Sequence, residues 1–279
     1  MDLLEYTHTA ETPEVFLRER GTLFARFDQA TQDSGNISYG VRIDGQRYFV
    51  KTAGAPYEPA FLNHDERVYW LRNATRLAAA LQDPVLPPLL NAIESPHGPL
   101  LIYPWIDGDC VRTTAEQRDD PSSSFQRFRR LPLAQLVDAL TAIFRVHVAL
   151  AERGWIANDF YDGAMLYDFD RAQLHLIDLD LYRSAPFTND MGRLFGSTRF
   201  MAPEEFERGA RIDERTTVFT MGRCIQLFVD PTSDIRRALH DVAERACQPQ
   251  PSERWPHMAD FYAAWLGATS GLAHSANTD

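Results

Sequence analysis

The sequence predicts an α+β protein in which a small antiparallel sheet with one helix precedes a mainly helical region. Short runs rich in aromatic and β-branched residues end near residue 103, and apolar residues at helical spacing predominate after residue 131. A polar stretch lies between them. We therefore divide the chain into a sheet region, a connecting and polar segment, a helical region and a flexible tail: residues 1–103, 104–130, 131–266 and 267–279.

The sheet region contains three runs typical of strands, followed by a helix and two further short strands. The three runs are residues 22–27, 37–43 and 47–52. Asp44-Gly45 separates the second run from the third and predicts a two-residue hairpin turn. Apolar residues at helical spacing predict a helix over 61–81, and the last strand ends at 100–103.

The remainder of the chain is predicted to be a polar connection followed by helices. Residues 112–130 include Pro and three consecutive serines, which favours a linker or a flexible insert. A long helix is expected over 133–153 and is ended by Gly154. A small hairpin is expected over 165–177, and further helices over 216–229, 235–247 and 258–266.

Composition excludes some classes of function. The 279 residues include 28 basic and 39 acidic side chains, for a net charge of -11, which argues against nucleic acid as the main partner. No uninterrupted apolar run approaches the roughly 18–20 residues of a membrane helix, and the first residues lack a secretory signal pattern. Three widely separated cysteines fit a reducing compartment without a zinc site. We expect a cytoplasmic protein with no membrane partner.

Almost all of the basic residues are arginine: the sequence has 27 arginines and a single lysine, Lys51. Lys51 ends the apolar run Tyr48-Phe49-Val50, which is a predicted strand. An ammonium is a compact point charge, whereas a guanidinium is a larger planar fork. The retained lysine therefore indicates a position where a small charge is needed, such as a site for phosphate oxygens.

Lys51 is the first of four charged residues whose order is informative. Glu66 follows it in the next predicted helix, Asp159 follows a long helix, and Asp178 ends the apolar run Leu176-Ile177. Further along are Gly196–Glu204, which ends in Ala-Pro-Glu, then Val218–Gly222, and finally Arg254. Over residues 22–266 this order resembles the protein kinase superfamily, and specifically a bacterial form of the Ser/Thr kinase fold.

The resemblance implies a bilobal protein-kinase-like fold, with a small antiparallel-sheet lobe and a mainly helical lobe, that binds ATP with Mg²⁺ or Mn²⁺. Lys51 would hold the nucleotide phosphates and pair with Glu66. Asp159 would receive the proton of the acceptor hydroxyl, and Asp178 would bind the metal. Arg254 would pair with Glu204 of Ala-Pro-Glu.

The nucleotide would also contact a loop and a connecting segment. Ser34, Gly35 and Asn36 would present backbone N–H groups to phosphate, although this loop has only two of the three glycines of the family pattern. Tyr103 and Trp105 would lie near the adenine, in the segment that joins the lobes.

The sequence departs from the family pattern in its predicted catalytic loop. Ala157-Asn158 replaces the His-Arg that precedes the aspartate, so control through a phosphorylated activation segment is not expected. Tyr161 stands where the family has lysine, and Ala164 stands where an asparagine binds the second metal. Thr217 replaces a buried aspartate that ties to this loop, so a different anchor is expected.

Two other carboxylates are candidates for the missing metal ligand. Asp180 lies two residues after Asp178, and both would face the same side if the strand continued through them. Asp162 lies one turn after Asp159. We hypothesise that Asp178 with Asp180 or Asp162 replaces the usual pair of metal ligands.

Four functions remain open at this point. The first is a Ser/Thr-type phosphotransferase acting on a hydroxyl acceptor, with the Ala-Pro-Glu segment favouring a protein. The second is a pseudokinase that binds nucleotide or a partner without transfer, which Ala164 favours. The third is a small-molecule kinase, since net negative charge attracts cationic metabolites. The fourth is transfer of AMP. The sequence does not indicate the acceptor or the oligomeric state.

Overall fold

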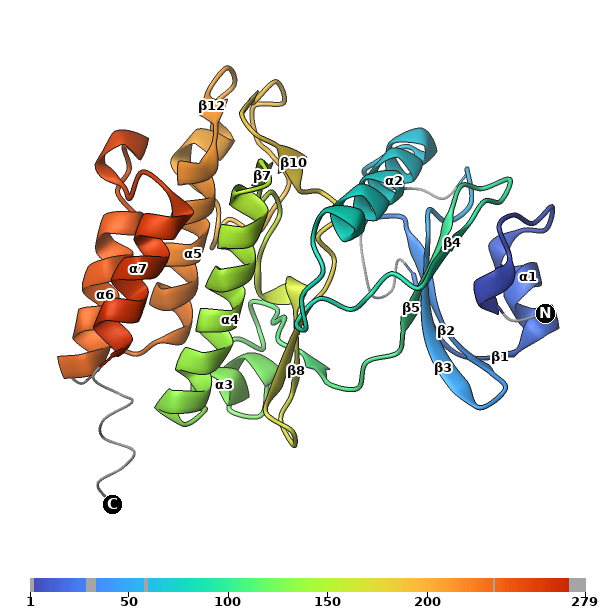
Figure 1. Cartoon of the computed structure of the whole chain (residues 1–279), viewed down its shortest axis with the longest axis horizontal. Helices are drawn as coiled ribbons and strands as arrows, with labels where there is room; N and C mark the ends of the chain where they lie inside the picture. Colours follow the sequence, from blue (N-terminus) through green and yellow to red (C-terminus); the bar gives the residue numbers. More distant parts are fainter. Residues whose placement is uncertain (1–2, 29–33, 58–59, 233, 271–279) are drawn as a thin grey trace. The chain divides into compact units, whose positions relative to one another are not determined.

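The computed structural model describes residues 3–28, 34–57, 60–232 and 234–270. The chain divides into two compact units, Met1–Asp107 and Gly108–Asp279, which we describe separately (Figure 1). The described residues form seven α-helices and a five-stranded antiparallel sheet, together with smaller sheets. The predicted α+β class is therefore confirmed.

The sheet of the first unit has the strand order β1-β2-β3-β5-β4 with every neighbouring pair antiparallel. Its strands are β1 (Thr22–Phe27), β2 (Ile37–Ile43), β3 (Gln46–Thr52), β4 (Asn91–Ile93) and β5 (Leu100–Pro104). Asp44 and Gly45 join β2 to β3 with φ of 49° and 82°. Two positive φ values in a two-residue loop indicate a type I′ turn, which confirms the predicted hairpin.

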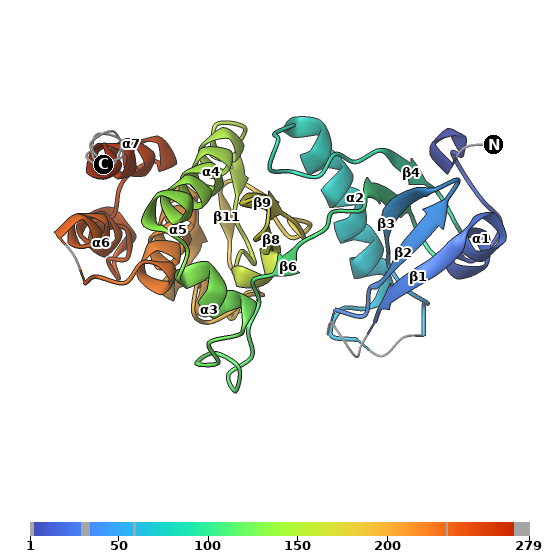
Figure 2. The same ribbon diagram turned by 90° about the horizontal axis from the view of Figure 1, so that it is seen from below.

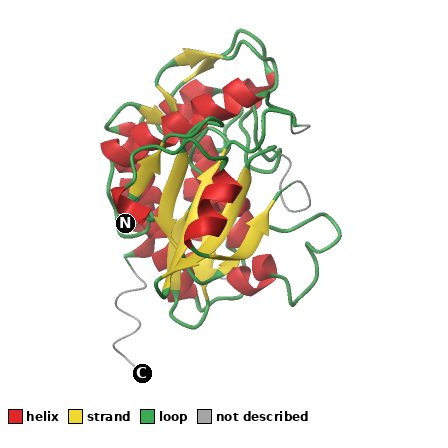
Figure 3. Ribbon diagram, turned by 90° about the vertical axis from the view of Figure 1, so that its right-hand side faces the viewer, coloured by secondary structure: helices red, strands yellow, loops and turns green. Residues whose placement is uncertain are grey.

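One face of this sheet forms the main core of the unit. Tyr39, Val41 and Val50 alternate with residues of the other face and pack with Phe16 and Leu17 of helix α1 (Pro13–Arg20). Figure 3 shows the strands in yellow with a short helix lying across them. The sequence predicted one helix in this region. Helix α1 and the short η1 (Leu3–Glu5) were not predicted, because eight and three residues give too weak a periodic signal.

Helix α2 (His64–Ala80) covers part of the opposite face. Its residues Leu71 and Ala74 are buried against Leu101 of β5 and Ala53, which follows β3. Figure 2 shows the sheet between α1 and α2. Lys51 of β3 lies on this same face, beside Leu101 of β5.

The second unit is built mainly from helices. They are α3 (Ser124–Arg129), α4 (Leu133–Ala151), α5 (Glu214–Phe228), α6 (Asp234–Ala246) and α7 (Met258–Thr269). Helices α4 to α7 lie side by side (Figure 1). Phe144 of α4 meets Phe261 and Trp265 of α7 edge to face, each with ring centroids 5.0 Å apart, which is a favourable aromatic geometry.

Among the described residues, α4 is the one helix that is long and apolar enough to cross a membrane by length and composition. The mean hydropathy of an 18-residue window in α4 is high, although the helix contains no uninterrupted apolar run of the length that a membrane helix needs. Half of its most apolar window is buried inside the protein, and Leu140, Ile143 and Phe144 belong to the core. Such burial is typical of a core helix. The cytoplasmic location stays a prediction.

Short strands and 3-10 turns place the loops of the second unit. The strand pairs are β7 (Trp155–Ile156) with β10 (Arg183–Ser184), β11 (Phe187–Thr188) with β12 (Arg211–Ile212), and β6 (Asp109–Cys110) beside the hairpin β8 (Met165–Asp168) and β9 (Gln173–Leu176). The turns are η2 (Asp162–Ala164), η3 (Pro203–Phe206) and η4 (Pro251–Glu253). Asp159 follows β7, and Asp178 follows β9.

Two segments differ from the sequence-based expectation. Residues 124–129 of the predicted polar insert form α3, in which Phe125 and Phe128 are buried and the Ser123 hydroxyl accepts from the N–H of Gln126 at 3.2 Å. The serine run is thus partly a helix cap. At the other end, α7 continues to Thr269, so the predicted flexible tail begins as helix. Residues 271–279 of that tail lie outside the described residues.

A buried ion pair joins the end of the segment Gly196–Glu204 to the C-terminal part of the unit. Arg254 donates from Nη1 to Glu204 Oε1 at 2.6 Å and from Nη2 to Oε2 at 2.8 Å. Its other three N–H groups donate to the carbonyl oxygens of Gln248, Arg215 and Pro249. All five guanidinium donors are therefore used, and the predicted pairing of Arg254 with Glu204 is confirmed.

Breaking this pair should destabilise the second unit strongly. Glu204→Gln leaves the Arg254 charge buried without a counter-charge, which typically costs about 3–5 kcal/mol. We expect this loss in the free energy of unfolding, measured with urea by tryptophan fluorescence. The control is Arg18→Gln, which breaks an exposed pair with Glu14 and should cost no more than about 1 kcal/mol. Equal losses for the two variants would contradict the prediction.

Candidate active site

Lys51 lies in the middle of the sheet of the first unit. It is on β3 between Ser38 of β2 and Leu101 of β5, which are its Cα partners and point to the same face. Lys51 is 8% exposed. Phe49, two residues earlier on β3, also points to this face. Burying an ammonium is costly without a compensating partner, so the position is a specialised one.

An aromatic cluster occupies the same face. Trp105 meets Phe24 edge to face with centroids 4.8 Å apart and stacks on Phe27 at 6.3 Å, and Phe27 lies 6.0 Å from Phe49. Beneath them is Gly40, where a Cβ would come within 2.7 Å of Phe24 and 2.9 Å of Trp105. A side chain at this position would displace these rings, so the indole lies close against the backbone of β2.

The connecting segment after β5 is fixed to the first unit by polar contacts. Trp105 Nε1 donates to Asp107 Oδ1 at 3.1 Å, and the Arg47 guanidinium binds both oxygens of Asp107. Tyr103 is the Cα partner of Phe49 and packs at the edge of the Leu71–Leu101 cluster. Both predicted adenine-binding residues therefore belong to the Lys51 face. Their contact with adenine stays a prediction.

The predicted phosphate loop is packed against the protein in its described part. Gly35 has φ of 78°, and a Cβ on it would lie 2.1 Å from Ala60 Cβ and 3.0 Å from Arg67 Nη1. The N–H of Asn36 donates to Ser34 Oγ at 3.3 Å. Gly35 thus serves close packing as well as a left-handed backbone. The predicted role of Ser34, Gly35 and Asn36 in phosphate binding stays a prediction.

Arg67, which no sequence pattern marked, fixes the chain around this loop. It is 1% exposed, and it donates to the carbonyl oxygens of Ala53, Ala55 and Leu62 at 2.7–2.9 Å. These carbonyls belong to the segment between β3 and α2. One guanidinium therefore ties the strand that carries Lys51 to the helix that carries Glu66.

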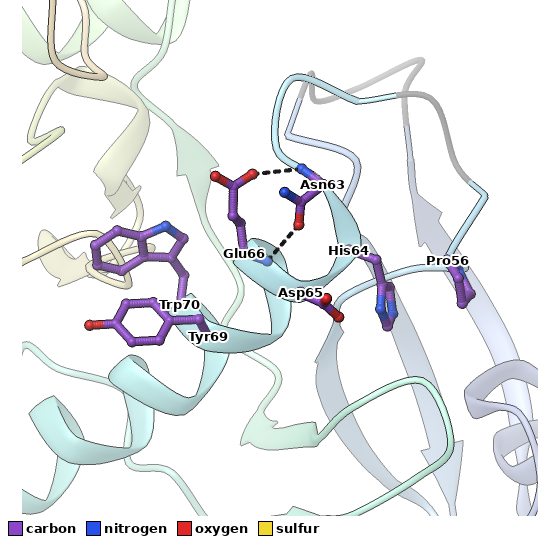
Figure 4. Close-up of a pocket in the computed structure, with 7 residues that line it drawn as sticks. All are labelled: Pro56, Asn63, His64, Asp65, Glu66, Tyr69 and Trp70. Carbon is purple, nitrogen blue, oxygen red and sulfur yellow. Dashed lines mark hydrogen bonds between the residues drawn. The ribbon is translucent and has the colours of Figure 1, made fainter. Parts of the chain in front are cut away.

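Glu66 has a structural role at the start of α2. Its carboxylate accepts from the N–H of Asn63 at 2.9 Å, while its own N–H donates to Asn63 Oδ1 at 3.0 Å (Figure 4). This reciprocal arrangement is a capping box. Glu66 is exposed and lines an open hollow of about 610 Å³ with Tyr69 and Trp70. The predicted ion pair between Glu66 and Lys51 stays a prediction.

In the second unit, Asp159 and Asp178 share an unusual backbone conformation. The described residues include four non-glycine positions with positive φ: Asp44 at 49°, Asp159 at 64°, Ala172 at 51° and Asp178 at 60°. Asp44 and Ala172 occupy hairpin turns, where positive φ is common. Asp159 and Asp178 are the predicted catalytic and metal-binding residues. The left-handed region is unfavourable for residues with a Cβ, so holding both carboxylates this way costs free energy.

Tyr161 lies close to both carboxylates. Burial raises the pKa of its phenol, and the charges of Asp178 and Asp159 raise it further, whereas Arg112 lowers it. Arg112 follows β6, whose residue Cys110 pairs with Leu166 of β8. The second unit therefore gathers two acids, a phenol and a guanidinium. Sequence reasoning found the acids through their motif and missed Arg112, which no motif marks.

The strand that would align Asp178 with Asp180 does not continue, and metal binding by Asp180 or Asp162 stays a prediction. β9 ends at Leu176 and Asp178 has positive φ, so the strand does not continue and its alternation does not align Asp178 with Asp180. Asp178 is exposed and Asp180 is buried. Asp162 is fully buried and pairs with Arg199, its Oδ2 lying 2.5 Å from Nη2. Within the described ranges no three His, Cys, Asp or Glu side chains form a metal-binding group.

The predicted catalytic loop is anchored by Thr217. Its hydroxyl oxygen on α5 accepts from the N–H of Ala157 at 3.0 Å, and both residues are buried. The expectation of a different anchor was wrong. The anchor lies at the same chain position, where a threonine hydroxyl in place of a carboxylate accepts the hydrogen bond.

Glu205 lies beside Asp159. Both line a small space that admits no water, together with Phe160, Gly196 and Met201. Burial raises the pKa of Glu205 to about 8, and the negative charges of Glu204 and Asp159 also act to raise it. The N–H of Ala202, which donates to Glu205 Oε2 at 2.6 Å, acts to lower it. At neutral pH Glu205 is therefore mostly a neutral acid.

No protein-family model matches the chain, and no curated protein matches it. Membership of the kinase superfamily therefore rests on the residues described above and stays a prediction.

Glu205→Gln should stabilise the protein in a pH-dependent way. The unfolded chain releases this proton near pH 4.5 and the folded chain near pH 8, so the wild-type chain loses stability as the pH rises between these values. Glutamine does not ionise and keeps the acceptor for Ala202. We expect a gain of about 3 kcal/mol in the free energy of unfolding at pH 7 and almost none at pH 4.5, measured by urea denaturation.

The exposed neighbour Glu207 provides the control. Glu207→Gln should change the free energy of unfolding by no more than about 0.5 kcal/mol at either pH. A Glu205→Gln gain that is the same at pH 4.5 and pH 7 would show that ionisation is not its cause.

Proposed function

We propose that the chain is an ATP- and Mg²⁺-dependent phosphotransferase with the bilobal fold of a Ser/Thr protein kinase. It transfers the γ-phosphoryl group to a hydroxyl acceptor. Residues 1–107 correspond to the sheet-containing lobe and residues 108–279 to the helical lobe. Lys51 holds phosphate oxygens, Asp178 holds the metal, and Asp159 positions the acceptor hydroxyl and receives its proton.

The observation that carries this proposal is the backbone conformation of Asp159 and Asp178. The order of motifs selected these two aspartates, and they are also the two non-glycine residues outside hairpin turns that have positive φ in the described part of the chain. Backbone strain of this kind collects at functional sites, where it directs a side chain. Two independent criteria therefore select the same pair.

Three further structural observations support the proposal. Lys51 is buried on the third strand of the sheet, the Glu204–Arg254 pair is formed, and the loop of Asp159 is tied to α5 through Thr217. Mg²⁺ is commonly held by one or two carboxylates together with substrate phosphates. The exposed carboxylate of Asp178 has the right chemistry for this role. The metal, when bound, would neutralise charge on the phosphates.

A pseudokinase is the second candidate. Gly35 is packed against Ala60 and Arg67, and the Glu66 carboxylate caps its own helix. In addition, Ala164 has no oxygen with which to bind a second metal. A nucleotide-binding module without transfer would keep Lys51 and lose only the acceptor chemistry.

Lys51→Arg tests whether the ammonium itself is needed. The variant keeps the charge and changes its shape, so we expect a loss of at least about 10²-fold in phosphoryl transfer, as for other removed charge-stabilising donors. Transfer is measured with Mg²⁺- or Mn²⁺-ATP by intact mass spectrometry of the chain and of added casein. Arg42→Ala, which removes an exposed cation of β2, is the control and should retain activity. Equal activity of Lys51→Arg and wild type would reject the role of Lys51.

Asp159→Asn tests the acceptor step. The amide keeps the shape of the carboxylate but cannot take a proton, so transfer should fall by about 10²–10⁴-fold while ATP still binds. Asp44→Asn is the matched control, because Asp44 is another aspartate with positive φ and lies in a hairpin turn. A wild-type chain that binds ATP and adds no mass to itself or to casein would favour the pseudokinase. A gain equal to AMP would favour AMP transfer.

A further inference from the structure

Besides Glu204–Arg254, the second unit contains an arginine–carboxylate pair whose carboxylate is fully buried, between Asp162 and Arg199. Asp162 lies in η2, three residues after Asp159. Arg199 lies in the segment Gly196–Glu204, which leads into Ala-Pro-Glu. The side chain of Asp162 is fully buried and that of Arg199 is 16% exposed. The pair therefore connects the predicted catalytic loop to the segment that the kinase resemblance assigns to the acceptor.

Arg199 is held from several sides. Its guanidinium lies over the rings of Phe125 and Phe200, 5.6 Å and 5.3 Å from their centroids. Its carbonyl oxygen accepts from Arg223 Nε of α5 at 2.8 Å. Phe125 belongs to α3, inside the segment expected to be a linker. The helix of that segment thus forms one wall around the pair.

The segment that Arg199 belongs to borders Asp159 directly. A Cβ built on Gly196 would lie 3.7 Å from Asp159 Oδ1 and 3.1 Å from the Met201 side chain. Any shift of residues 196–201 therefore changes the space beside the Asp159 carboxylate. In the proposed reaction, the acceptor hydroxyl would approach Asp159 next to this segment.

The two buried pairs of this unit differ in how fully their atoms are used. Arg254 uses all five donors, and both Glu204 oxygens are bound. In the Asp162–Arg199 pair, Asp162 Oδ1 and Arg199 Nη1 are buried and have no hydrogen-bond partner. An incompletely satisfied buried pair is the more easily opened of the two, because less is lost on separating it.

We infer that the Asp162–Arg199 pair is a clamp that positions residues 196–201 beside Asp159, so that acceptor binding depends on it. This inference rests on the proposed function for the identity of the reaction. The charge in the clamp comes from the chain itself, so the segment is held without a phosphorylated residue. Asp162 and Arg199 are positioning residues, and Asp162 acts through the segment and not as a metal ligand.

Hydrogen–deuterium exchange of the full chain without ligand tests the clamp directly. Arg199→Lys keeps a charge and loses the planar fork, and Asp162→Asn removes the negative charge. In both variants we expect exchange of residues 196–202 to rise at least tenfold, with no comparable rise in the distant hairpin of β8 and β9. The double variant Asp162→Asn/Arg199→Gln leaves no buried charge, so it stays testable if a single variant unfolds. Its segment should also exchange faster than wild type.

Steady-state kinetics with Mg²⁺-ATP and casein separates positioning from general damage. The clamp variants should raise the KM for casein at least fivefold and leave the KM for ATP within twofold of wild type. Arg171→Gln, which breaks a pair with Asp168 outside the clamp, should change neither. Unchanged exchange of residues 196–202 in folded variants would overturn the inference, as would a raised KM for ATP alone. If the wild type transfers no phosphate, the proposed function fails, and the exchange rates alone decide whether the clamp exists.

Discussion

The structure of the helical unit depends on one buried guanidinium, that of Arg254. It binds both oxygens of Glu204 and three backbone carbonyls, which come from the start of α5 and from the turn after α6. Glu204 also accepts from the hydroxyl of Thr216 at 2.8 Å. These contacts fix three segments to one another: the segment that ends at Glu204, the first turn of α5, and the turn between α6 and α7. Thr217, next to Thr216, then anchors the loop that carries Asp159.

Buried or largely buried guanidinium groups join separate segments at two other places in the described part of the chain. Arg67 connects three carbonyls between β3 and α2, and the Arg199 guanidinium pairs with Asp162 and lies over Phe125 of α3. A guanidinium presents five donors in a fixed plane, so a single side chain can satisfy several separate backbone groups. A lysine ammonium carries its three donors on a single nitrogen, so it is less suited to binding several separate groups in one plane. In this protein buried arginines join segments, and the one lysine is buried on one face of a sheet.

The sequence predicted the regular elements well and the site in part. β1 and β2 were placed with the bounds that the structure has, because alternation and the Asp44-Gly45 turn are local signals. The pairing of Arg254 with Glu204 followed from the motif. By contrast, α1 and α3 are too short for periodicity, and α3 is recognisable mainly from the phenylalanines that it buries.

What sequence reasoning missed at the site were tertiary relations. Whether Asp162 meets a metal or Arg199 depends on how two distant segments pack, and neither has a local pattern that decides it. The end of β9 before Asp178 likewise reflects a backbone torsion that no residue pattern specified. Gly35 was read as a phosphate-loop glycine, and its packing on Arg67 became visible only with the fold.

The isolation of Lys51 also makes the protein a convenient subject for chemical labelling. An amine-reactive reagent has one side-chain target in the whole chain, and that target is buried among strands β2, β3 and β5. Apart from the terminal amine, every modified molecule would report on the same position of the sheet. The reactivity of a single amine can therefore serve as a direct measure of access to this face of the first unit.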